Sequence, residues 1–531
     1  MLMKKASIVI SAMLLLLSLP AFSHLGQLPA TPQTVRNVPL TTGSIEYVGT
    51  VDVSTLPASA GPVLGLLPQL PSLGMSSSKS NSAPATPSFS TINVQPGSSF
   101  VSVAKSIEGT PGYNPNPCLC APSDMGLAAS SQYVFQMVNL AGTVYTTSGA
   151  VAKPGFSLAD FWFAPVRSMS DPQVLFDARA GRWLASIIVI VNHVRFAVSA
   201  TSNPLGIWYI YQVHTPASNI LPDQPFIGYS DDKFLIAAND FNFNSQTGVG
   251  APFIGAQYWI INKLQMMAGA FAPDMQTNTP TLVPTPSGTI DFRIDPMQQL
   301  SPGTTAYMAE NCEGATNICP DAGVASTTGG ITVFTVTGLP PTAVVARATV
   351  PIALTGTPSS ADQPGNPASL ATNDERMVSA VWNNGLIWTT LNDGNQCPTA
   401  SCVRLDEIST TTALPSLLQD FDFTFNGAAT FYGAVSTDPS NNLVVMFETS
   451  SSSMFPSLLV TGQKTSMAPN SLAASKTVQE GSAADLTTRW GDYYYATTQP
   501  GAGSTFWVSG GYRTIQLFEG WQTRIGQISF S

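Results

Sequence analysis

A short unit recurs about seven times after residue 117 and restricts the fold more than any other feature of the chain. Each copy combines an Asp, a strand-like run, a tight turn and a second, strongly apolar run. In the second copy these are Asp171, residues 173–176, a turn at Gly181 and residues 183–191. One unit has too little apolar surface to form a core alone, so neighbouring copies are expected to pack on one another.

Most copies begin with an Asp, and these residues are Asp124, Asp171, Asp223, Asp291, Asp374 and Asp492. The remaining copy, residues 430–447, has no leading Asp. The copies lie about 61 residues apart on average, which leaves room for four strands in each. Third and fourth strands are predicted at residues 194–200 with 207–213 and at residues 331–336 with 346–350.

The expected fold is therefore all-β: a β-propeller of about seven four-stranded blades, preceded by a disordered N-terminal segment. Six or eight blades are the alternatives, because the first and last copies are short of outer strands. These two copies can be completed by one another or by the N-terminal segment. Ring closure would protect the strand edges of an apolar protein.

The N-terminal part divides into two segments before the repeats. Residues 1–23 have Lys4 and Lys5, an apolar run and small residues near a cleavage position, which predicts a signal peptide and a secreted protein, extracellular or periplasmic. Residues 24–116 are rich in Pro, Ser and Thr and are predicted to be a mostly disordered linker. Within this linker, residues 45–53 and 99–103 alternate well enough to add a strand somewhere. The propeller is expected at residues 117–531.

Composition excludes several classes of function. Only 10% of residues are charged and the formal net charge is −10, so a nucleic-acid binder or a protein of anionic membrane surfaces is excluded. Because the chain is acidic, a charged partner is expected to be a cation. Beyond the signal, the longest apolar run is residues 183–191, which is too short for a membrane span.

The six cysteines form three local pairs: Cys118 with Cys120, Cys312 with Cys319, and Cys397 with Cys402. An even number in an exported chain favours disulfides. The second and third pairs would close short loops between strands. The first pair is so close that a bridge would be strained, and a free or metal-binding pair is its alternative.

The recurrent Asp is the best candidate for a site. Innermost strands line a propeller's central channel, so Asp124, Asp171, Asp223, Asp291, Asp374 and Asp492 are expected to form an acidic ring there. Crowded carboxylates repel one another unless they take up protons or share a hard cation, for which Ca²⁺ is the candidate. The alternative is that each Asp caps a turn through a local hydrogen bond.

A second candidate lies in the last copy, where Arg489, Trp490 and Asp492 combine an anion donor, a flat apolar surface and a carboxylate. Together they could hold a sugar or carboxylate ligand. The alternative is an internal ion pair that locks the last blade. Tryptophans at corresponding places of three copies, Trp183, Trp388 and Trp507, are expected to be core rather than a binding platform.

Motifs of known enzymes are missing from the sequence. His193 and His214 are the only histidines beyond His24, so a histidine-based zinc centre or a Ser-His-Asp triad is hard to assemble. HExxH, GxSxG and phosphate-binding glycine loops are also absent.

Three segments carry a resemblance to a family of exported bacterial β-propeller proteins. They are Pro122 and Asp124 near the first copy, residues 171–183, and residues 489–493 with Phe506, Trp507 and 523–526. The likeness covers residues 117–531 and implies the fold, without an established reaction.

More distantly, the chain is similar to the sialidase superfamily, whose Asp-box turns read S-x-D-x-G-x-x-W. Residues 202–208 come nearest but have no Asp and are one residue short before the Trp. Sialidases also use three arginines around one ligand, and Arg179, Arg293, Arg376, Arg489 and Arg513 are available here. No catalytic role is carried over.

We therefore favour an exported binding or surface-interaction module for a glycan or protein ligand, with function on the loops of one channel face. The alternative is a sialidase-like glycoside hydrolase of extracellular glycans, which would need two carboxyl groups about 5 to 9.5 Å apart in an open pocket. A structural coat component is the third candidate, and a channel plugged with apolar side chains would favour it.

Overall fold

The structure is a computed structural model of the chain. The described residues are 35–59, 89–112, 116, 118, 120–244, 249–278, 291–312, 329–365, 368–487, 489–515 and 521–531. The chain divides into two units, Met1–Gln33 and Thr34–Ser531, and every described residue belongs to the second. The signal peptide expected at residues 1–23 lies outside the described residues.

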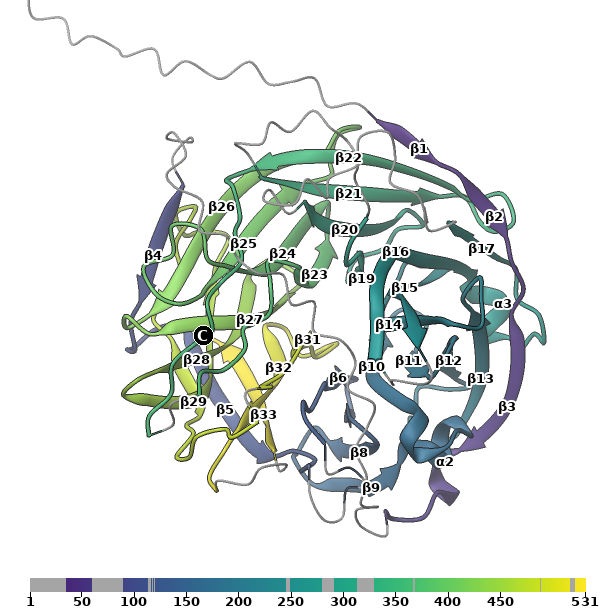
Figure 1. The fold of residues 1–531 in the computed structure, drawn as a ribbon, viewed down its shortest axis with the longest axis horizontal. Coiled ribbons are helices and arrows are strands. Elements are labelled where there is room, and N and C mark those ends of the chain that lie inside the picture. The colour runs from purple at the N-terminus through teal and green to yellow at the C-terminus, as the bar shows by residue number, and fades with distance from the viewer. Residues whose placement is uncertain are drawn as a thin grey trace, which may run out of the picture. The chain divides into compact units, whose positions relative to one another are not determined.

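Each predicted copy of the repeated unit contains an antiparallel strand pair, and the innermost strands surround the centre in Figure 1. The all-β propeller is therefore confirmed. The pairs are β6 (Gly126–Ala129) with β7 (Tyr133–Val138), β10 (Met169–Asp177) with β11 (Arg182–Val189), β14 (Ile220–Tyr229) with β15 (Lys233–Asn244), β18 (Asp295–Pro296) with β20 (Ala306–Cys312), β23 (Met377–Asn383) with β24 (Leu386–Asp393), β27 (Ala429–Thr437) with β28 (Leu443–Ser451), and β31 (Tyr495–Thr498) with β32 (Thr505–Tyr512).

Outer strands extend these pairs by antiparallel pairing. The third and fourth strands predicted in the second and fourth copies are confirmed as β12 and β13 and as β21 and β22. The outer strands are β8 (Ala141–Thr146), β9 (Val151–Ser157), β12 (His193–Ser199), β13 (Ile207–His214), β16 (Val249–Asn262), β17 (Met275–Asn278), β21 (Gly329–Thr337), β22 (Val344–Ile352), β25 (Cys402–Ser409), β26 (Ser416–Phe425), β29 (Met454–Gln463), β30 (Lys476–Gln479) and β33 (Gln522–Phe530).

About seven separate blades were expected, and the hydrogen bonding corrects this count. The described strands form six sheets, one of which has eleven strands. The short strand β19 (Gln298–Gln299) causes the difference, because it pairs in parallel with both β14 and β23. It thereby joins two antiparallel groups that the sequence pattern treats as separate.

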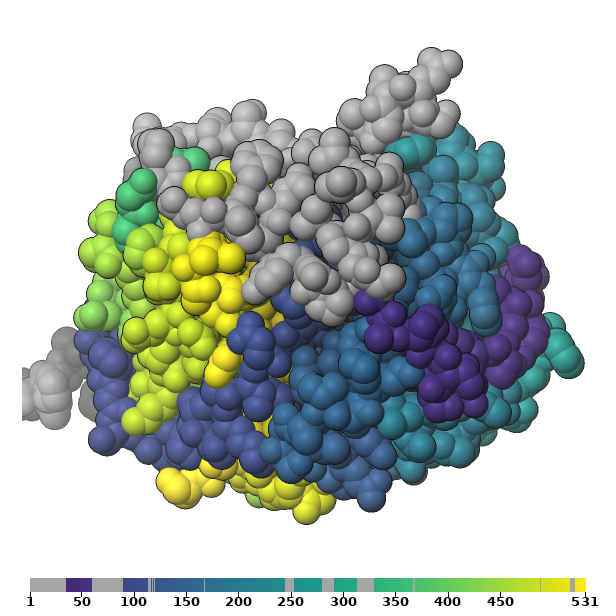
Figure 2. Space-filling view, turned by 90° about the horizontal axis from the view of Figure 1, so that it is seen from below, coloured from purple at the N-terminus to yellow at the C-terminus, as the bar shows by residue number. Residues whose placement is uncertain are grey.

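Strands from the N-terminal segment lie along the outside of the propeller. They are β1 (Arg36–Val38), β2 (Leu40–Thr42), β3 (Glu46–Asp52), β4 (Ser90–Val94) and β5 (Val101–Glu108), which pair with β22, β17, β13, β26 and β33 respectively. Figure 2 shows their purple and dark-blue residues on the surface. The strands expected at 45–53 and 99–103 are thus confirmed as β3 and β5. The described parts of the expected linker, residues 24–116, belong to the propeller's sheets.

Strand β5 closes the ring. The last sheet has the order β31, β32, β33 and β5, so it combines three C-terminal strands with one N-terminal strand. Val101 on β5 is fully buried, and the rings of Phe100 and Phe530 lie 4.9 Å apart. This pairing covers an edge of β33 that would otherwise be open to other chains.

Helices are short in the described chain. The α-helices are α2 (Leu158–Trp162) and α3 (Lys263–Met267), and the 3-10 helices are η1 (Val53–Thr55) and η2 (Val166–Ser168). Ser157 and Asn262 cap the α-helices by accepting hydrogen bonds from backbone N–H groups of their first turns. None of the helices within the described ranges is long and apolar enough to cross a membrane.

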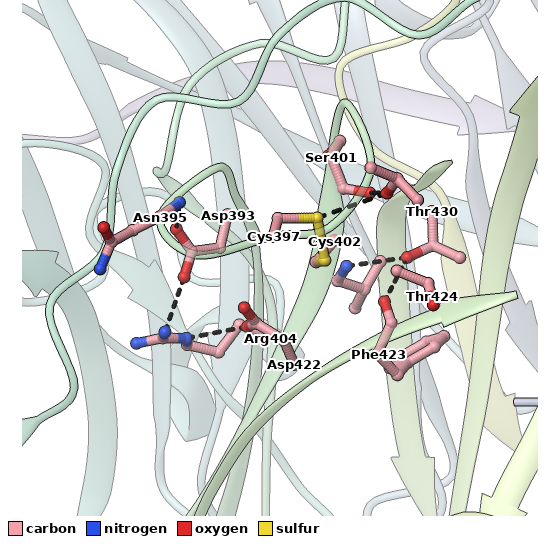
Figure 3. Close-up of a disulfide and its surroundings, with 12 residues drawn as sticks. Asp393, Asn395, Cys397, Ser401, Cys402, Arg404, Asp422, Phe423, Thr424 and Thr430 are labelled. Atoms are coloured by element: carbon pink, nitrogen blue, oxygen red, sulfur yellow. Dashed lines mark hydrogen bonds and ion pairs between the residues drawn. A yellow bond between two sulfur atoms is a disulfide. The ribbon is translucent and has the colours of Figure 1, made fainter. Parts of the chain in front are cut away.

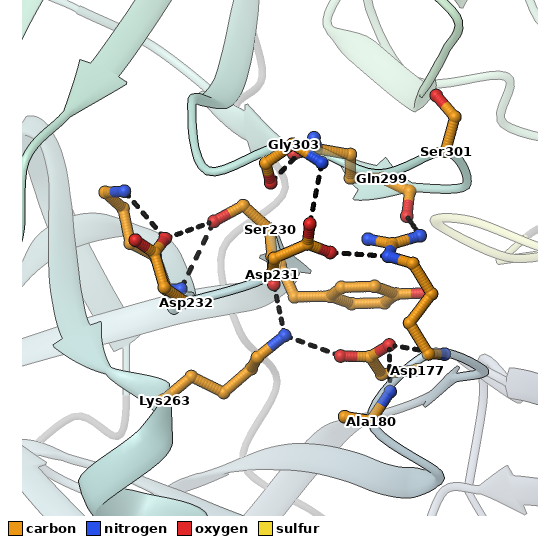
Figure 4. Close-up of polar contacts among 12 residues, drawn as sticks. Asp177, Ala180, Ser230, Asp231, Asp232, Lys263, Gln299, Ser301 and Gly303 are labelled. Atoms are coloured by element: carbon orange, nitrogen blue, oxygen red, sulfur yellow. Dashed lines mark hydrogen bonds and ion pairs between the residues drawn. The ribbon is translucent and has the colours of Figure 1, made fainter.

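Turns of neighbouring inner strand pairs are tied together by charged side chains (Figure 4). The Asp177 carboxylate accepts from the Lys263 ammonium at 2.5 Å and from the backbone N–H of Ala180 at 3.1 Å. Arg179 pairs with Asp231 at 2.5 Å, and the other Asp231 oxygen accepts from the Gly303 N–H at 2.8 Å. These contacts link the turns that follow β10, β14 and β19.

Two of the three expected disulfides are present among the described residues. Cys397 and Cys402 are bonded, with Cα atoms 5.8 Å apart, and Cys118 is bonded to Cys120. Cys319, the expected partner of Cys312, lies outside the described residues. Figure 3 shows that the Cys397–Cys402 bridge lies close to Arg404, which pairs with Asp393 at 2.6 Å and Asp422 at 3.1 Å.

The three corresponding tryptophans are buried, as expected. Trp183 and Trp507 are fully buried, and Trp388 is 2% exposed. Trp388 lies on β24 and packs in a cluster with Val403 and Phe421. These side chains are therefore core, and no tryptophan of this set offers a surface for a ligand.

We predict that Trp388→Ala lowers the free energy of unfolding by about 3 to 5 kcal/mol, because it leaves a cavity in this cluster. Chemical denaturation monitored by circular dichroism measures the change. A midpoint equal to that of the parent protein would show that the side chain is not packed in the core.

Removing the N-terminal strands should destabilise the propeller. A chain that starts at residue 117 lacks β1 to β5 and is expected to melt at lower temperature and to aggregate, because the edges of β13, β17, β22, β26 and β33 become exposed. A chain that starts at residue 35 keeps all five strands and serves as the control. Equal melting temperatures and monomeric behaviour of both chains would contradict the role of these strands.

Candidate functional site

The starts of the inner strands share an unusual backbone conformation. Six of them carry a non-glycine residue with φ between 33° and 58°, in the left-handed region. Asp124 and Asp171 were expected at such positions, whereas the other copies use different side chains there. The six residues are Asp124, Asp171, Gln224, Arg293, Asn373 and Tyr432.

A buried Asn near the end of the second strand holds this conformation in two copies. Asn139 donates to the Pro122 carbonyl of its own copy at 3.0 Å and accepts from the Asp171 N–H of the next at 3.1 Å. Asn392 repeats the arrangement: it donates to the Thr372 carbonyl and accepts from the Tyr432 N–H, both at 2.7 Å. The start of one inner strand is thereby fixed against the preceding copy.

Two further copies have half of this arrangement. Asn239 accepts from the Arg293 N–H at 2.9 Å, and Asn311 donates to the Glu375 carbonyl at 2.7 Å. These asparagines are not among the residues predicted from the sequence. Their signal is an Asn near the end of the second apolar run in four copies, at Asn139, Asn239, Asn311 and Asn392.

Inner strands also approach one another closely near these residues. A Cβ atom on Gly126 would lie 2.8 Å from the Val174 nitrogen, and one on Gly228 would lie 2.5 Å from the Met297 carbonyl oxygen. Only glycine permits such contacts between backbones. The start of β6 therefore lies against β10, and the end of β14 lies against the segment between β18 and β19.

Four of the six expected acids gather at this end of the channel, and we call them the hub acids: Asp124, Asp171, Asp223 and Asp492. They come from the starts of β6, β10, β14 and β31. Asp124 and Asp171 are each 2% exposed and Asp223 is 5% exposed. Carboxyl groups this buried are rarely found without paired cations.

Burial and mutual repulsion raise the pKa values of three of the hub acids. Burial is the larger cause, and it raises the pKa of Asp223 well above its ordinary value, with a further contribution from the charges of Asp171 and Asp492. The pKa of Asp124 is also raised well above its ordinary value, first by burial and then by the charges of Asp492 and Asp171. The pKa of Asp171 is raised by burial and by Asp492.

Asp492 behaves differently. Burial opposes its ionisation, but the Arg489 guanidinium and the Asn373 amide hold its pKa below the ordinary value. Arg489 pairs with one carboxylate oxygen at 2.9 Å, and Asn373 donates to the other at 2.8 Å. The pKa of Asp492 is therefore shifted in the opposite direction to the pKa values of Asp124, Asp171 and Asp223.

The other two expected acids are each engaged in an ion pair. Asp291 pairs with Arg347 at 3.0 Å. Asp374 binds the Arg376 guanidinium through both oxygens, at 2.6 and 2.7 Å, and accepts from the Arg376 N–H at 3.2 Å. Asp374 thus combines the turn-capping role with an ion pair.

The described acids are not arranged as the ligands of a metal ion would be. Among the described residues, no group of three or more His, Cys, Asp or Glu side chains is arranged to hold a metal ion. The Ca²⁺ site expected at Asp124, Asp171, Asp223, Asp291, Asp374 and Asp492 stays a prediction.

Arg489 and Trp490 take different positions at the hub. The Arg489 side chain is 32% exposed while its guanidinium pairs with Asp492. Trp490 is only 3% exposed. The Arg513 guanidinium lies over its ring, with the guanidinium carbon 5.3 Å from the ring centre. Trp490 therefore offers no face to a ligand, and Arg489 is the solvent-accessible member of the predicted trio.

Aromatic side chains lie next to the hub acids. Phe226 and Tyr493 pack edge to face at 4.9 Å, and the Arg293 guanidinium lies 3.1 Å from the Phe226 ring centre. A cavity of about 30 Å³ beside Asp295 and Tyr495 has room for about one water molecule.

Comparisons with known proteins find similar solved structures. The endo-arabinase of Bacteroides thetaiotaomicron VPI-5482 is 9% identical with a TM-score of 0.30, covering 56% of this chain and 94% of that one. Trypanosoma rangeli sialidase in complex with the inhibitor DANA is 8% identical with a TM-score of 0.34, covering 72% and 56%. The NanB sialidase of Streptococcus pneumoniae is 9% identical with a TM-score of 0.34, covering 75% and 83%.

Identities and TM-scores this low assign neither a family nor an activity to the chain. No protein-family profile matches it, and no curated protein matches its sequence. The site must be interpreted from its own residues.

The hub acids should make stability fall as the pH rises. The folded-state pKa of Asp223 is raised above that of the unfolded chain, so its contribution is complete below about pH 3.9 and is lost as the pH rises through the folded pKa. Asp223→Asn keeps the size of the side chain and cannot ionise. The variant is expected to lose less stability than the parent between pH 5 and pH 8, by up to about 1.4 kcal/mol per pH unit.

Thermal melts at several pH values measure this difference. Glu480→Gln is the control, because Glu480 is exposed and lies in a loop away from the hub acids. Identical pH dependence of the parent protein and Asp223→Asn would show that Asp223 is ionised at no cost.

Proposed function

We propose that the chain is an exported β-propeller module that binds its ligand at the hub acids, on the side of Arg489. The observation that carries the proposal is the gathering of Asp124, Asp171, Asp223 and Asp492 from four inner strands. Buried carboxyls cost stability, and perturbed carboxyls that converge in one place are more often kept for binding or catalysis than for folding.

A ligand with several hydrogen-bonding groups suits this end of the channel. The polar side chains around the hub acids include Arg489, Asn373 and Gln224, which come from three different copies. Sugar hydroxyls and polar protein side chains both match such a set, so a glycan or protein ligand is proposed.

Export is part of the same proposal. The apolar run within residues 1–23 and the two basic residues before it are typical of a signal peptide. The Cys397–Cys402 disulfide is of the kind that persists in oxidising compartments. The module would therefore meet its ligand outside the cytoplasm.

A glycan array and a panel of extracellular proteins, probed with the chain from residue 24, test the proposal. Binding is expected, and Arg489→Ala and Asp492→Asn should each weaken it at least tenfold. Glu480→Gln should bind like the parent. A ligand that binds the parent, Arg489→Ala and Asp492→Asn with equal affinity would bind elsewhere on the protein. That result would contradict the proposal.

A glycoside hydrolase is the second candidate, favoured by the opposite pKa directions of Asp492 and Asp223. One ionised and one protonated carboxyl are what acid and base roles in glycoside hydrolysis require. Release of nitrophenol from a panel of aryl glycosides tests this role. Hydrolysis lost in both Asp492→Asn and Asp223→Asn would support it, and no hydrolysis of any glycoside would leave binding as the function.

A further inference from the structure

A cavity of about 170 Å³ lies on the outer part of the first sheet, whose strand order is β6, β7, β8 and β9. One side of the cavity is formed by β8 and β9. The other side is formed by the N-terminal segment, at Ser59, residues 109–111 and Asn116. An apolar cavity of about 150 Å³ holds a benzene ring in another protein. The space therefore suits a ligand of about six to eight non-hydrogen atoms.

Hydrogen bonds fix the walls of this cavity. The Ser59 N–H donates to the Gly155 carbonyl at 2.8 Å, which holds the N-terminal segment against β9. The Thr110 N–H donates to the Gln136 side chain at 2.7 Å. Asn116 is 1% exposed and uses its amide on nearby backbone groups. The walls therefore form without a ligand, as they do in most binding pockets.

Three residues with hydroxyl groups, Thr110, Thr143 and Tyr145, form one wall of the cavity. Thr110 donates to the Thr143 oxygen at 2.7 Å, and both threonine hydroxyls lie within hydrogen-bonding reach of the Tyr145 oxygen. Burial raises the pKa of Tyr145 to about 12, so this phenol is uncharged at neutral pH. A hydroxyl both donates and accepts hydrogen bonds. This hydroxyl wall therefore matches a hydroxyl group on a ligand.

Apolar side chains form much of the rest of the cavity, and they are Pro111, Ala141, Val151 and Pro154. Val151 is 58% exposed, so the cavity opens to solvent beside β9. No charged side chain of the described chain lines the cavity. A charged ligand would lose water there without gaining a counter-ion, and burial of an unpaired charge is costly. The cavity therefore favours a neutral ligand.

We propose that this cavity binds a small neutral molecule of the phenol type, with one apolar ring and one hydroxyl group. The volume fits one ring, the hydroxyl wall fits one hydroxyl, and the rest of the lining carries no charge. A sugar of the same size has several hydroxyls, most of which would face apolar walls without a partner. A flexible alkyl chain would lose more conformational entropy than a ring. None of the hub acids lines the cavity, so this inference is independent of the proposed function.

Gly155 and Thr143 allow the space and the hydroxyl wall to be changed separately. A Cβ atom on Gly155 would lie 3.6 Å from the Thr143 Oγ1, which is an ordinary van der Waals contact. Gly155→Ala therefore adds a methyl group without a steric clash, and because Gly155 lines the cavity, this group takes up part of its volume. Thr143→Val keeps the shape of the side chain but removes its hydroxyl.

NMR titration of the methyl-labelled chain from residue 24 with phenol, benzene and benzoate tests the inference. Phenol is expected to shift the methyl resonances of Ala141, Thr143 and Val151. It should bind at least threefold more tightly than benzene, which makes no hydrogen bond to the hydroxyl wall, and benzoate should not bind. Gly155→Ala should weaken phenol binding at least threefold, and Thr143→Val should remove the preference for phenol over benzene. Glu480→Gln should bind phenol as the parent does.

Several outcomes would overturn the inference. Methyl resonances of the cavity that do not move at millimolar phenol would show that phenol does not enter it. Equal affinity of the parent for phenol and benzene would contradict the role of the hydroxyl wall, and tighter binding of benzoate than of phenol would contradict a neutral site. Unchanged phenol binding in a folded Gly155→Ala variant would place the ligand outside the cavity. Melting curves establish that each variant is folded, and Thr143→Val decides the question alone if Gly155→Ala does not fold.

Discussion

The hydrogen bonds of Asn139 and Asn392 across neighbouring copies are the constraint on which the hub depends. Each Asn fixes the start of the next inner strand in a left-handed conformation that most residues avoid. Fixed in this way, the strand starts bring carboxyl groups together although burial and repulsion oppose it. The backbone arrangement therefore sets the electrostatics of the site.

The N-terminal strands act on the same ring from outside. Strand β5 completes the last sheet and β1 to β4 cover the edges of other sheets. Closure of the ring holds the last inner strand, which carries Asp492, against the first, which carries Asp124. Ion pairs at the opposite turns, such as that of Lys263 with Asp177, add a second set of ties between copies. Contacts between copies are thus present at both ends of the inner strands.

Much of this architecture could be predicted from sequence, because strand pairs alternate with turn residues in a regular way. Asn384 and Gly385, for example, both have positive φ in the hairpin that their sequence predicts. The parallel pairing of β19 could not be predicted, since two residues carry no periodic signal. The described strands of the Pro-rich segment were only partly visible, because β1 and β2 have three residues each.

The candidate site, like the fold, could be predicted only in part from the sequence. Asp124, Asp171, Asp223 and Asp492 were predicted from their positions before strands, and they do gather. Asp291 was misplaced because the fourth inner strand begins at Asp295, and Arg293 holds the left-handed position there. The pairing of Arg376 with Asp374 depends on side-chain direction, which spacing alone does not reveal.

The central claim is that the hub acids are close enough to control one another's protonation. Carbon-13 NMR of aspartate-labelled protein, with resonances assigned by Asn substitutions, measures their titration directly. Asp492→Asn should lower the pKa of both Asp124 and Asp223, because it removes a neighbouring negative charge. Titration of Asp124 and Asp223 that is the same with and without the Asp492 carboxylate would show that the acids do not form one cluster.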